Sequence, residues 1–142
     1  LIFGLPFGAG ILLHVMTGGD IEAGDHLFIV VLGSLLIATG LTLAAWATIA
    51  LRKRGEHPDP ARPTTALVTE GPYAYSRNPI YVSFTSVALG IGLLLNSYWM
   101  LGSVPIAALA LNFLVVTREE RYLETVIGHQ YSGYRESVRR WL

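Results

Sequence analysis

The sequence contains no cysteine, which excludes disulfide bonds, zinc sites built on thiolates and a cysteine nucleophile. Charge is also scarce, at 14% of the 142 residues, where soluble domains usually carry about 25%. The ten basic and ten acidic side chains cancel, so no nucleic-acid partner is expected. The four histidines are scattered without the spacing of metal ligands, so no metal site is predicted.

What the chain does have is long stretches without a charged residue. Residues 27–51 meet the requirement of roughly 20 apolar residues for one membrane span. Residues 79–116 are too long for one span, and Asn96-Ser97 near their centre predicts a turn. A shorter apolar run, 1–16, has no basic start, which favours a retained helix over a signal peptide. The pattern predicts an all-α integral membrane protein with four transmembrane helices at about 1–17, 26–51, 79–95 and 98–117.

The charges between these runs predict which side of the membrane each loop occupies. Loop 18–25 has three acidic residues and no lysine or arginine, whereas basic residues follow the second and fourth runs. By the positive-inside rule, the 52–78 loop and the C-terminal tail face the cytoplasm, and so does the N-terminus. All three assignments agree with an even number of spans. We therefore expect an inner-membrane protein with both termini in the cytoplasm.

Two cytoplasmic segments are expected to be ordered. The 52–78 loop contains Pro58, Pro60, Pro63 and Pro72, which predict a stiff cap over the helix ends. The tail has apolar residues at three-to-four spacing from Tyr131 to Leu142, with arginines between them, which predicts an amphipathic helix. This helix could lie on the membrane surface or pack on the protein's own loop. The chain is expected to form one domain, 1–142.

A polar and aromatic block, 71–81, precedes the long run, and Arg118-Glu119-Glu120-Arg121 follows it. If the run is a hairpin, both blocks meet at one membrane face. Asn78-Pro79 alone is explained as a helix start. The two glutamates are expected at a helix C-terminus, where they oppose the helix dipole. They therefore need nearby cations, which Arg77, Arg118 and Arg121 can supply. Either this is a salt-bridged helix end, or it binds a ligand with hydroxyls, an amino group or positive charge.

Four blocks of residues carry a resemblance to a known family. The chain resembles the isoprenylcysteine carboxyl methyltransferase family and, more broadly, small membrane methyltransferases that include phospholipid methyltransferases. The resemblance covers about residues 50–142. The matching blocks are Leu67-Val68-Thr69-Glu70-Gly71-Pro72-Tyr73, Arg77-Asn78-Pro79-Ile80-Tyr81, Arg118-Glu119-Glu120-Arg121-Tyr122-Leu123 and Gly128-His129-Gln130-Tyr131-Ser132-Gly133-Tyr134.

The resemblance implies a methyltransferase that uses S-adenosylmethionine, releases S-adenosylhomocysteine and acts on a lipophilic, membrane-embedded substrate. That substrate would be a carboxylate such as an isoprenylcysteine, or a lipid amine. The cofactor pocket would lie in about residues 52–142, at the cytoplasmic helix ends, closed by the C-terminal tail. The implied catalytic residues are Arg77 and Glu120. The implied cofactor-binding residues are Val68, Gly71, Tyr73, Asn78, Pro79, Tyr81, Glu119 and Glu120.

Two features bear on this expectation. The family's best-studied members have histidine between the Arg and Pro of the second block, where this chain has Asn78. Asparagine cannot carry a proton, so no proton transfer is expected there. Gly90-Ile91-Gly92 resembles a cofactor segment of the phospholipid branch but would lie about 16 Å into the membrane, where close helix packing is expected instead. The main alternative is a non-enzymatic four-helix membrane subunit or assembly factor.

Overall fold

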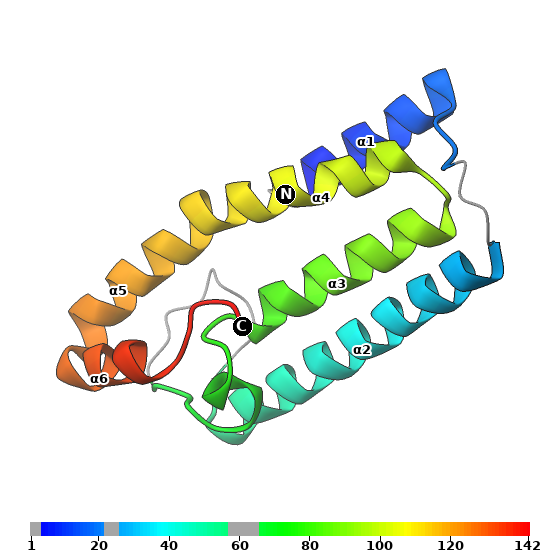
Figure 1. The fold of residues 1–142 in the computed structure, drawn as a ribbon. Helices are drawn as coiled ribbons and strands as arrows, with labels where there is room; N and C mark the ends of the chain where they lie inside the picture. The colour runs from blue at the N-terminus through cyan, green and yellow to red at the C-terminus, as the bar shows by residue number, and fades with distance from the viewer. Residues whose placement is uncertain (1–3, 22–25, 57–65) are drawn as a thin grey trace.

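A computed structural model describes residues 4–21, 26–56 and 66–142 of the chain (Figure 1). These residues form helices and connecting segments, with no strand beyond an isolated bridge between Asp20 and Ser97. The predicted all-α class is confirmed. The helices are α1 (Gly4–Thr17), α2 (His26–Lys53), a 3-10 turn (Gly71–Ala74), α3 (Pro79–Leu94), α4 (Tyr98–Leu111), a π-helical turn (Asn112–Val116), α5 (Thr117–Ile127) and α6 (His129–Ser137).

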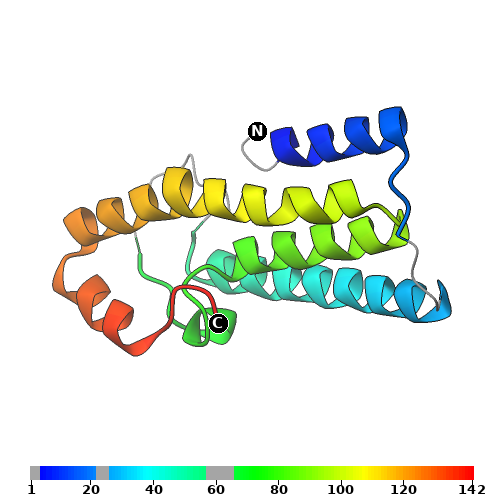
Figure 2. The ribbon, with the colours of Figure 1, turned by 45° about the horizontal axis from the view of Figure 1, so that its top comes forward.

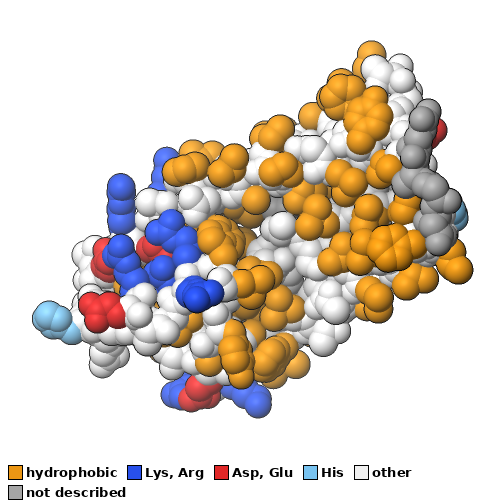
Figure 3. All heavy atoms as spheres, in the orientation of Figure 1, with side chains coloured by type: hydrophobic (Ala, Val, Ile, Leu, Met, Phe, Trp, Pro, Cys, Tyr) orange, Lys and Arg blue, Asp and Glu red, His pale blue; other side chains and the backbone are white. Residues whose placement is uncertain are grey.

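The four apolar helices lie side by side in a row. α3 packs against α2 on one side and against α4 on the other, and α1 packs on α4 (Figures 1 and 2). Two helices, His26–Lys53 and Tyr98–Ile127, are long and apolar enough to cross a membrane, and α1 and α3 are shorter apolar helices. Many large apolar side chains are exposed, among them Leu35, Ile106 and Phe113. Figure 3 shows hydrophobic side chains spread over the helices on one face of the molecule. Helices of this length and surface are those of a membrane protein.

Glycines bring α2 and α3 into close contact. A Cβ atom at Gly90 would lie 2.6 Å from the carbonyl oxygen of Gly33, and one at Gly40 would lie 2.9 Å from the carbonyl oxygen of Ser83. A larger side chain does not fit at these two positions, so the backbones of α2 and α3 are in direct contact. Small residues allow such close packing of helices in membranes. The expectation that Gly90 serves helix packing agrees with this geometry.

The hairpin turn between α3 and α4 lies where the sequence predicts it. Asn96 has a positive φ of 53°, and the hydroxyl of Ser97 caps α4 by accepting from the Met100 amide at 3.3 Å. The segment after α1 is tied to this turn, because the Ile21 amide donates to the carbonyl of Asn96 at 3.0 Å. α1 therefore joins the bundle at the hairpin end.

Two expected helix boundaries differ from the structure. The fourth helix does not end near residue 117 but continues through the π-helical turn into α5, as far as Ile127. The charged residue Arg118 ends the apolar stretch, but it does not end the helix, which is why the sequence placed the boundary too early. The tail is helical only to Ser137, and Val138 is extended with φ −124° and ψ 133°. Pro58, Pro60 and Pro63 of the predicted cap lie outside the described residues.

Candidate functional site

Polar residues from five segments meet at the end of the bundle opposite the hairpin turn. The 71–78 segment and the start of α3 face α5, while α6 and the extended tail close the space between them (Figures 1 and 2). We call this set the polar cluster. Its members are Tyr73, Arg77, Tyr81, Glu119, Glu120, Tyr131, Tyr134 and Arg140.

Glu120 forms the centre of the polar cluster. Its side chain is 9% exposed and binds two arginines: Arg77 through Nη1 at 2.9 Å, and Arg140 through Nη2 at 2.6 Å. Arg140 Nε also donates to Glu120 at 3.1 Å, and Arg140 Nη1 donates to Asn112 Oδ1 at 3.3 Å. Two charge-assisted contacts with one arginine hold the carboxylate in a fixed orientation.

These contacts revise the expected electrostatics of the glutamates. Glu119 and Glu120 lie in the first turn of α5, far from its end, so the predicted conflict with a helix C-terminus is wrong. Arg77 supplies a cation as expected. The second cation is Arg140 from the tail, whereas Arg118 and Arg121 are exposed. Glu120 is neutralised by a segment 20 residues away along the chain.

Glu119 differs from Glu120 because its hydrogen-bond partner is a tyrosine and not an arginine. The Tyr81 hydroxyl donates to Glu119 Oε1 at 3.0 Å, which joins the first turn of α3 to α5. Among residues 4–21, 26–56 and 66–142, no lysine or arginine forms an ion pair with this carboxylate. Tyr81 therefore fixes the position of Glu119, while burial raises the pKa of the Glu119 carboxyl above its ordinary value.

Two tyrosines of α6 attach the tail helix to the 71–78 segment. The buried Tyr134 hydroxyl donates to the carbonyl of Tyr73 at 2.6 Å, and the Tyr131 hydroxyl accepts from Arg77 Nη1 at 3.4 Å. Burial raises the pKa of both the Tyr73 and the Tyr134 phenols, so both stay protonated at neutral pH. Of the two placements left open by the sequence, the structure shows α6 packed on the protein's own loop.

The extended tail continues this contact. The Arg77 amide donates to the carbonyl of Arg139 at 3.0 Å, and Asn78 Nδ2 donates to the carbonyl of Arg140 at 2.9 Å. Asn78 stands directly before Pro79 at the start of α3, as the sequence predicts, but its side chain makes no cap hydrogen bond. Its carboxamide instead holds the tail in place.

The other residues predicted to bind a cofactor lie on the α2 side of the same segment. Val68 packs with Ala47 of α2, and so does Tyr73, whose carbonyl also accepts from Tyr134 in the polar cluster. Gly71 has a positive φ of 62°, and a Cβ atom there would lie 3.1 Å from Trp46 Nε1. Pro79 is buried at the start of α3. The structure thus brings Tyr73, Asn78, Tyr81, Glu119 and Glu120 around one region and places Val68, Gly71 and Pro79 behind it.

Residues 28–130 match the family model for phospholipid methyltransferase. The chain belongs to the phospholipid methyltransferase family. It is also 38% identical, over 74 residues, to the protein-S-isoprenylcysteine O-methyltransferase of Schizosaccharomyces pombe. That match covers 51% of this chain but only 30% of the yeast protein. An uncharacterized protein of Haemophilus influenzae is 41% identical over 64 residues, which are 44% of this chain and the whole of that protein. No solved structure matches the chain.

Two polar groups of this phospholipid methyltransferase family member are suited to ligands that carry a carboxylate and hydroxyl or ammonium groups. Arg77 Nε is buried and has no hydrogen-bond partner in the part of the chain that the structure describes. A buried donor without an acceptor is costly, and a carboxylate oxygen would satisfy it. Glu119 offers acceptor oxygens for hydroxyl or ammonium groups. The acceptor oxygens of Glu119 therefore fit the hydroxyl and ammonium groups of S-adenosylmethionine, the cofactor that the family resemblance implies.

Sequence reasoning missed Arg140 and Asn112 as members of this region. Tyr131 and Tyr134 were expected in the tail helix, but only as part of its apolar face. Arg140 carries no local signal that separates it from the neighbouring Arg139. Only the path of the tail decides that Arg140 turns inward while Arg139 is exposed.

Proposed function

We propose that this chain is an S-adenosylmethionine-dependent methyltransferase that acts on a lipophilic acceptor at the cytoplasmic face of the inner membrane. The observation that carries the proposal is the polar cluster at one end of the apolar helices, with a buried arginine donor and a carboxylate, that of Glu119, that pairs with no arginine of the described residues. Membership of the phospholipid methyltransferase family supports it.

The membrane arrangement belongs to the same proposal. Helices α1 to α4 span the bilayer, and the Asn96-Ser97 hairpin faces away from the cytoplasm. Both termini and the polar cluster then face the basic, cytoplasmic side, where Arg52-Lys53-Arg54 and the tail arginines lie. The chain acts as one domain, and residues 52–142 carry the cofactor site.

When bound, S-adenosylmethionine supplies an activated methyl group attached to a sulfonium. Glu119, held by Tyr81, binds the hydroxyl or amino groups of the cofactor. Glu120 fixes Arg77, and Tyr73 with Asn78 forms the wall between α3 and the tail. Val68, Gly71 and Pro79 shape that wall from behind. The tail excludes water from the methyl group, which in-line transfer requires.

The acceptor is either a carboxylate such as that of an isoprenylcysteine or a lipid amine. A carboxylate needs no general base, and the free Nε–H of Arg77 can orient it. An ammonium acceptor must first lose a proton. Both oxygens of Glu120 already accept from arginines, whereas burial raises the pKa of the Glu119 carboxyl. Glu119 is therefore the base for an amine, while Arg77 and Glu120 act together as the catalytic pair that orients a carboxylate.

Calorimetric titration of the detergent-solubilised protein with S-adenosylhomocysteine tests the proposal. The wild-type protein should bind, and Glu119→Gln should weaken binding by about tenfold or more, a change that corresponds to ~1.4 kcal/mol. Arg118→Gln, one position earlier on the exposed face, is the matched control and should bind like the wild type. Absence of heat with folded wild-type protein would refute the proposal and favour a non-enzymatic membrane subunit. In that case Glu120→Gln and Arg77→Ala should change which partners co-purify with the protein.

A further inference from the structure

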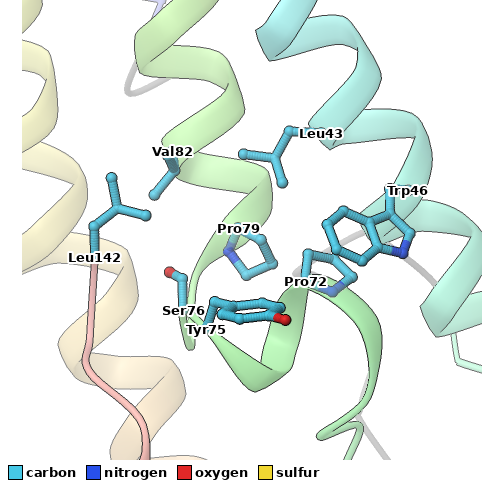
Figure 4. Close-up of a pocket in the computed structure, with 8 residues that line it drawn as sticks. All are labelled: Leu43, Trp46, Pro72, Tyr75, Ser76, Pro79, Val82 and Leu142. Atoms are coloured by element: carbon cyan, nitrogen blue, oxygen red, sulfur yellow. The ribbon is translucent and has the colours of Figure 1, made fainter.

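An apolar groove lies beside the polar cluster, on the other side of the 71–78 segment (Figure 4). Its walls come from Leu43 and Trp46 of α2, Pro79 and Val82 of α3, Tyr75 of the turn, and Leu142 of the tail. In Figure 4 these side chains surround one space, with the two α2 residues facing Leu142 across it. The volume of the groove is about 180 Å³. An apolar cavity of about 150 Å³ binds a molecule the size of benzene, so a segment of hydrocarbon chain fits here.

The groove is separate from the proposed methyl-transfer site. Pro79 lies two residues before Tyr81, which places the two side chains roughly 200° apart around α3. Tyr81 points to Glu119 and the polar cluster, and Pro79 lines the groove. Between them stands a wall in which Asn78 holds the carbonyl of Arg140. A molecule in the groove therefore does not reach Glu119 without moving the tail.

The rim of the groove has the features of the membrane boundary. Trp46 and Tyr75 are 47% and 72% exposed, and aromatic rings of this kind favour the headgroup level. The groove opens among apolar side chains that face outward from α2 and α3. A gap in such a surface loses dispersion contacts unless a lipid chain fills it.

Two exposed cations lie a short distance along the chain from groove residues. Lys53 lies seven residues after Trp46, which places it about 10 Å further along the same face of α2. Arg139 precedes the groove residue Leu142 by three positions. Both side chains are exposed, and neither forms an ion pair within the described ranges 4–21, 26–56 and 66–142. Cations at this level attract the anionic lipids of the cytoplasmic leaflet.

We propose that the groove binds one acyl chain of an anionic phospholipid of the cytoplasmic leaflet, as a lipid site distinct from the methyl-acceptor site. The chain lies between α2, α3 and Leu142, and Lys53 and Arg139 select the negative headgroup. Because Leu142 belongs to the tail that closes the polar cluster, a bound lipid also holds that tail against the 76–78 segment.

Photolabelling in lipid nanodiscs tests this inference. The nanodiscs contain phosphatidylcholine and a trace of phosphatidylglycerol with a diazirine in its acyl chain, and labelled residues are mapped by mass spectrometry. Labelling should concentrate at groove residues such as Leu43 and Val82. Unlabelled phosphatidylglycerol should compete at about tenfold lower concentration than phosphatidylcholine, a ratio equivalent to ~1.4 kcal/mol.

Three variants sharpen the test. Val82→Trp fills the groove and should abolish saturable labelling, while Leu35→Trp on the exposed face of α2 should not. Lys53→Gln with Arg139→Gln should keep chain labelling but remove the preference for the anionic lipid. This double variant stays informative if Val82→Trp does not fold. Titration with S-adenosylhomocysteine, run in parallel, separates loss of the lipid site from loss of the proposed cofactor site.

Two results would overturn the inference. Labelling spread evenly over all lipid-facing residues, without saturation, would mean that only bulk lipid surrounds the groove. Displacement of the label by a prenylated cysteine, but not by phosphatidylglycerol, would mean that the groove holds the chain of a methyl acceptor.

Discussion

Replacing Glu120 with glutamine tests whether the buried ion pairs hold the polar cluster together. The substitution keeps the size of the side chain but removes its charge. Arg77, of which only 9% is exposed, then loses its counter-ion, and Arg140, which is 32% exposed, keeps at most one acceptor, because glutamine has a single side-chain oxygen. Removing one partner of a buried pair typically costs about 3–5 kcal/mol. Because Arg140 remains partly solvated, we expect the lower part of that range, about 3 kcal/mol of unfolding free energy.

Glu124→Gln is the matched control on the same helix. Glu124 also pairs with an arginine, Arg135, but the two side chains are 38% and 48% exposed. Exposed pairs contribute little because water already solvates both charges. Denaturant titration in detergent micelles, followed by tryptophan fluorescence, measures both variants against the wild type. An equal loss in both variants, or no loss in Glu120→Gln, would refute the claim that Glu120 stabilises the fold through burial.

Other substitutions test the packing and the tail. Gly90→Ala places a methyl group 2.6 Å from the carbonyl oxygen of Gly33, so it should lower the unfolding free energy by about 1–3 kcal/mol in the same denaturant titration. Gly102→Ala is the control, because the space around Gly102 is open, and it should not destabilise the protein. Tyr134→Phe leaves the buried carbonyl of Tyr73 without its donor and should speed amide exchange in α6, measured by hydrogen–deuterium exchange mass spectrometry; unchanged exchange would count against the bond as an anchor. Burial raises the pKa of the Tyr134 phenol above its ordinary value of 10.0. The protonated phenol therefore contributes fully to stability below about pH 10, and this contribution is lost as the pH rises further. The melting temperature of the wild type should fall more steeply above about pH 10 than that of Tyr134→Phe.

Much of the helical layout follows from local sequence. Charge-free runs set α2 and α3 close to their observed ends, because a membrane helix needs a continuous apolar stretch of bilayer length. The predicted turn at Asn96-Ser97 is confirmed, since asparagine tolerates positive φ and serine caps the next helix. The meeting of Arg77 with Glu120 follows from the hairpin itself, which returns the chain to the face that it left.

Other boundaries depend on contacts that local sequence does not specify. The charged stretch after Val116 was expected outside the fourth helix, yet α5 continues it because Glu119 and Glu120 find partners on the inner side. The spacing of Tyr131, Tyr134 and Val138 predicted one helix to the end of the chain. The tail instead becomes extended after Ser137, where its carbonyls accept from Arg77 and Asn78.

The sequence by itself therefore determined the apolar helices, the turn that joins α3 to α4, the family and the two blocks that meet at one end of the helices. Those features depend on residue patterns read along a short length of chain. Only the tertiary structure decided that Arg140 pairs with Glu120, that Glu119 has a tyrosine as partner, and that the tail separates a polar cluster from an apolar groove. Each of these depends on which of several equivalent side chains the packing turns inward, and that choice is made between segments distant in the sequence.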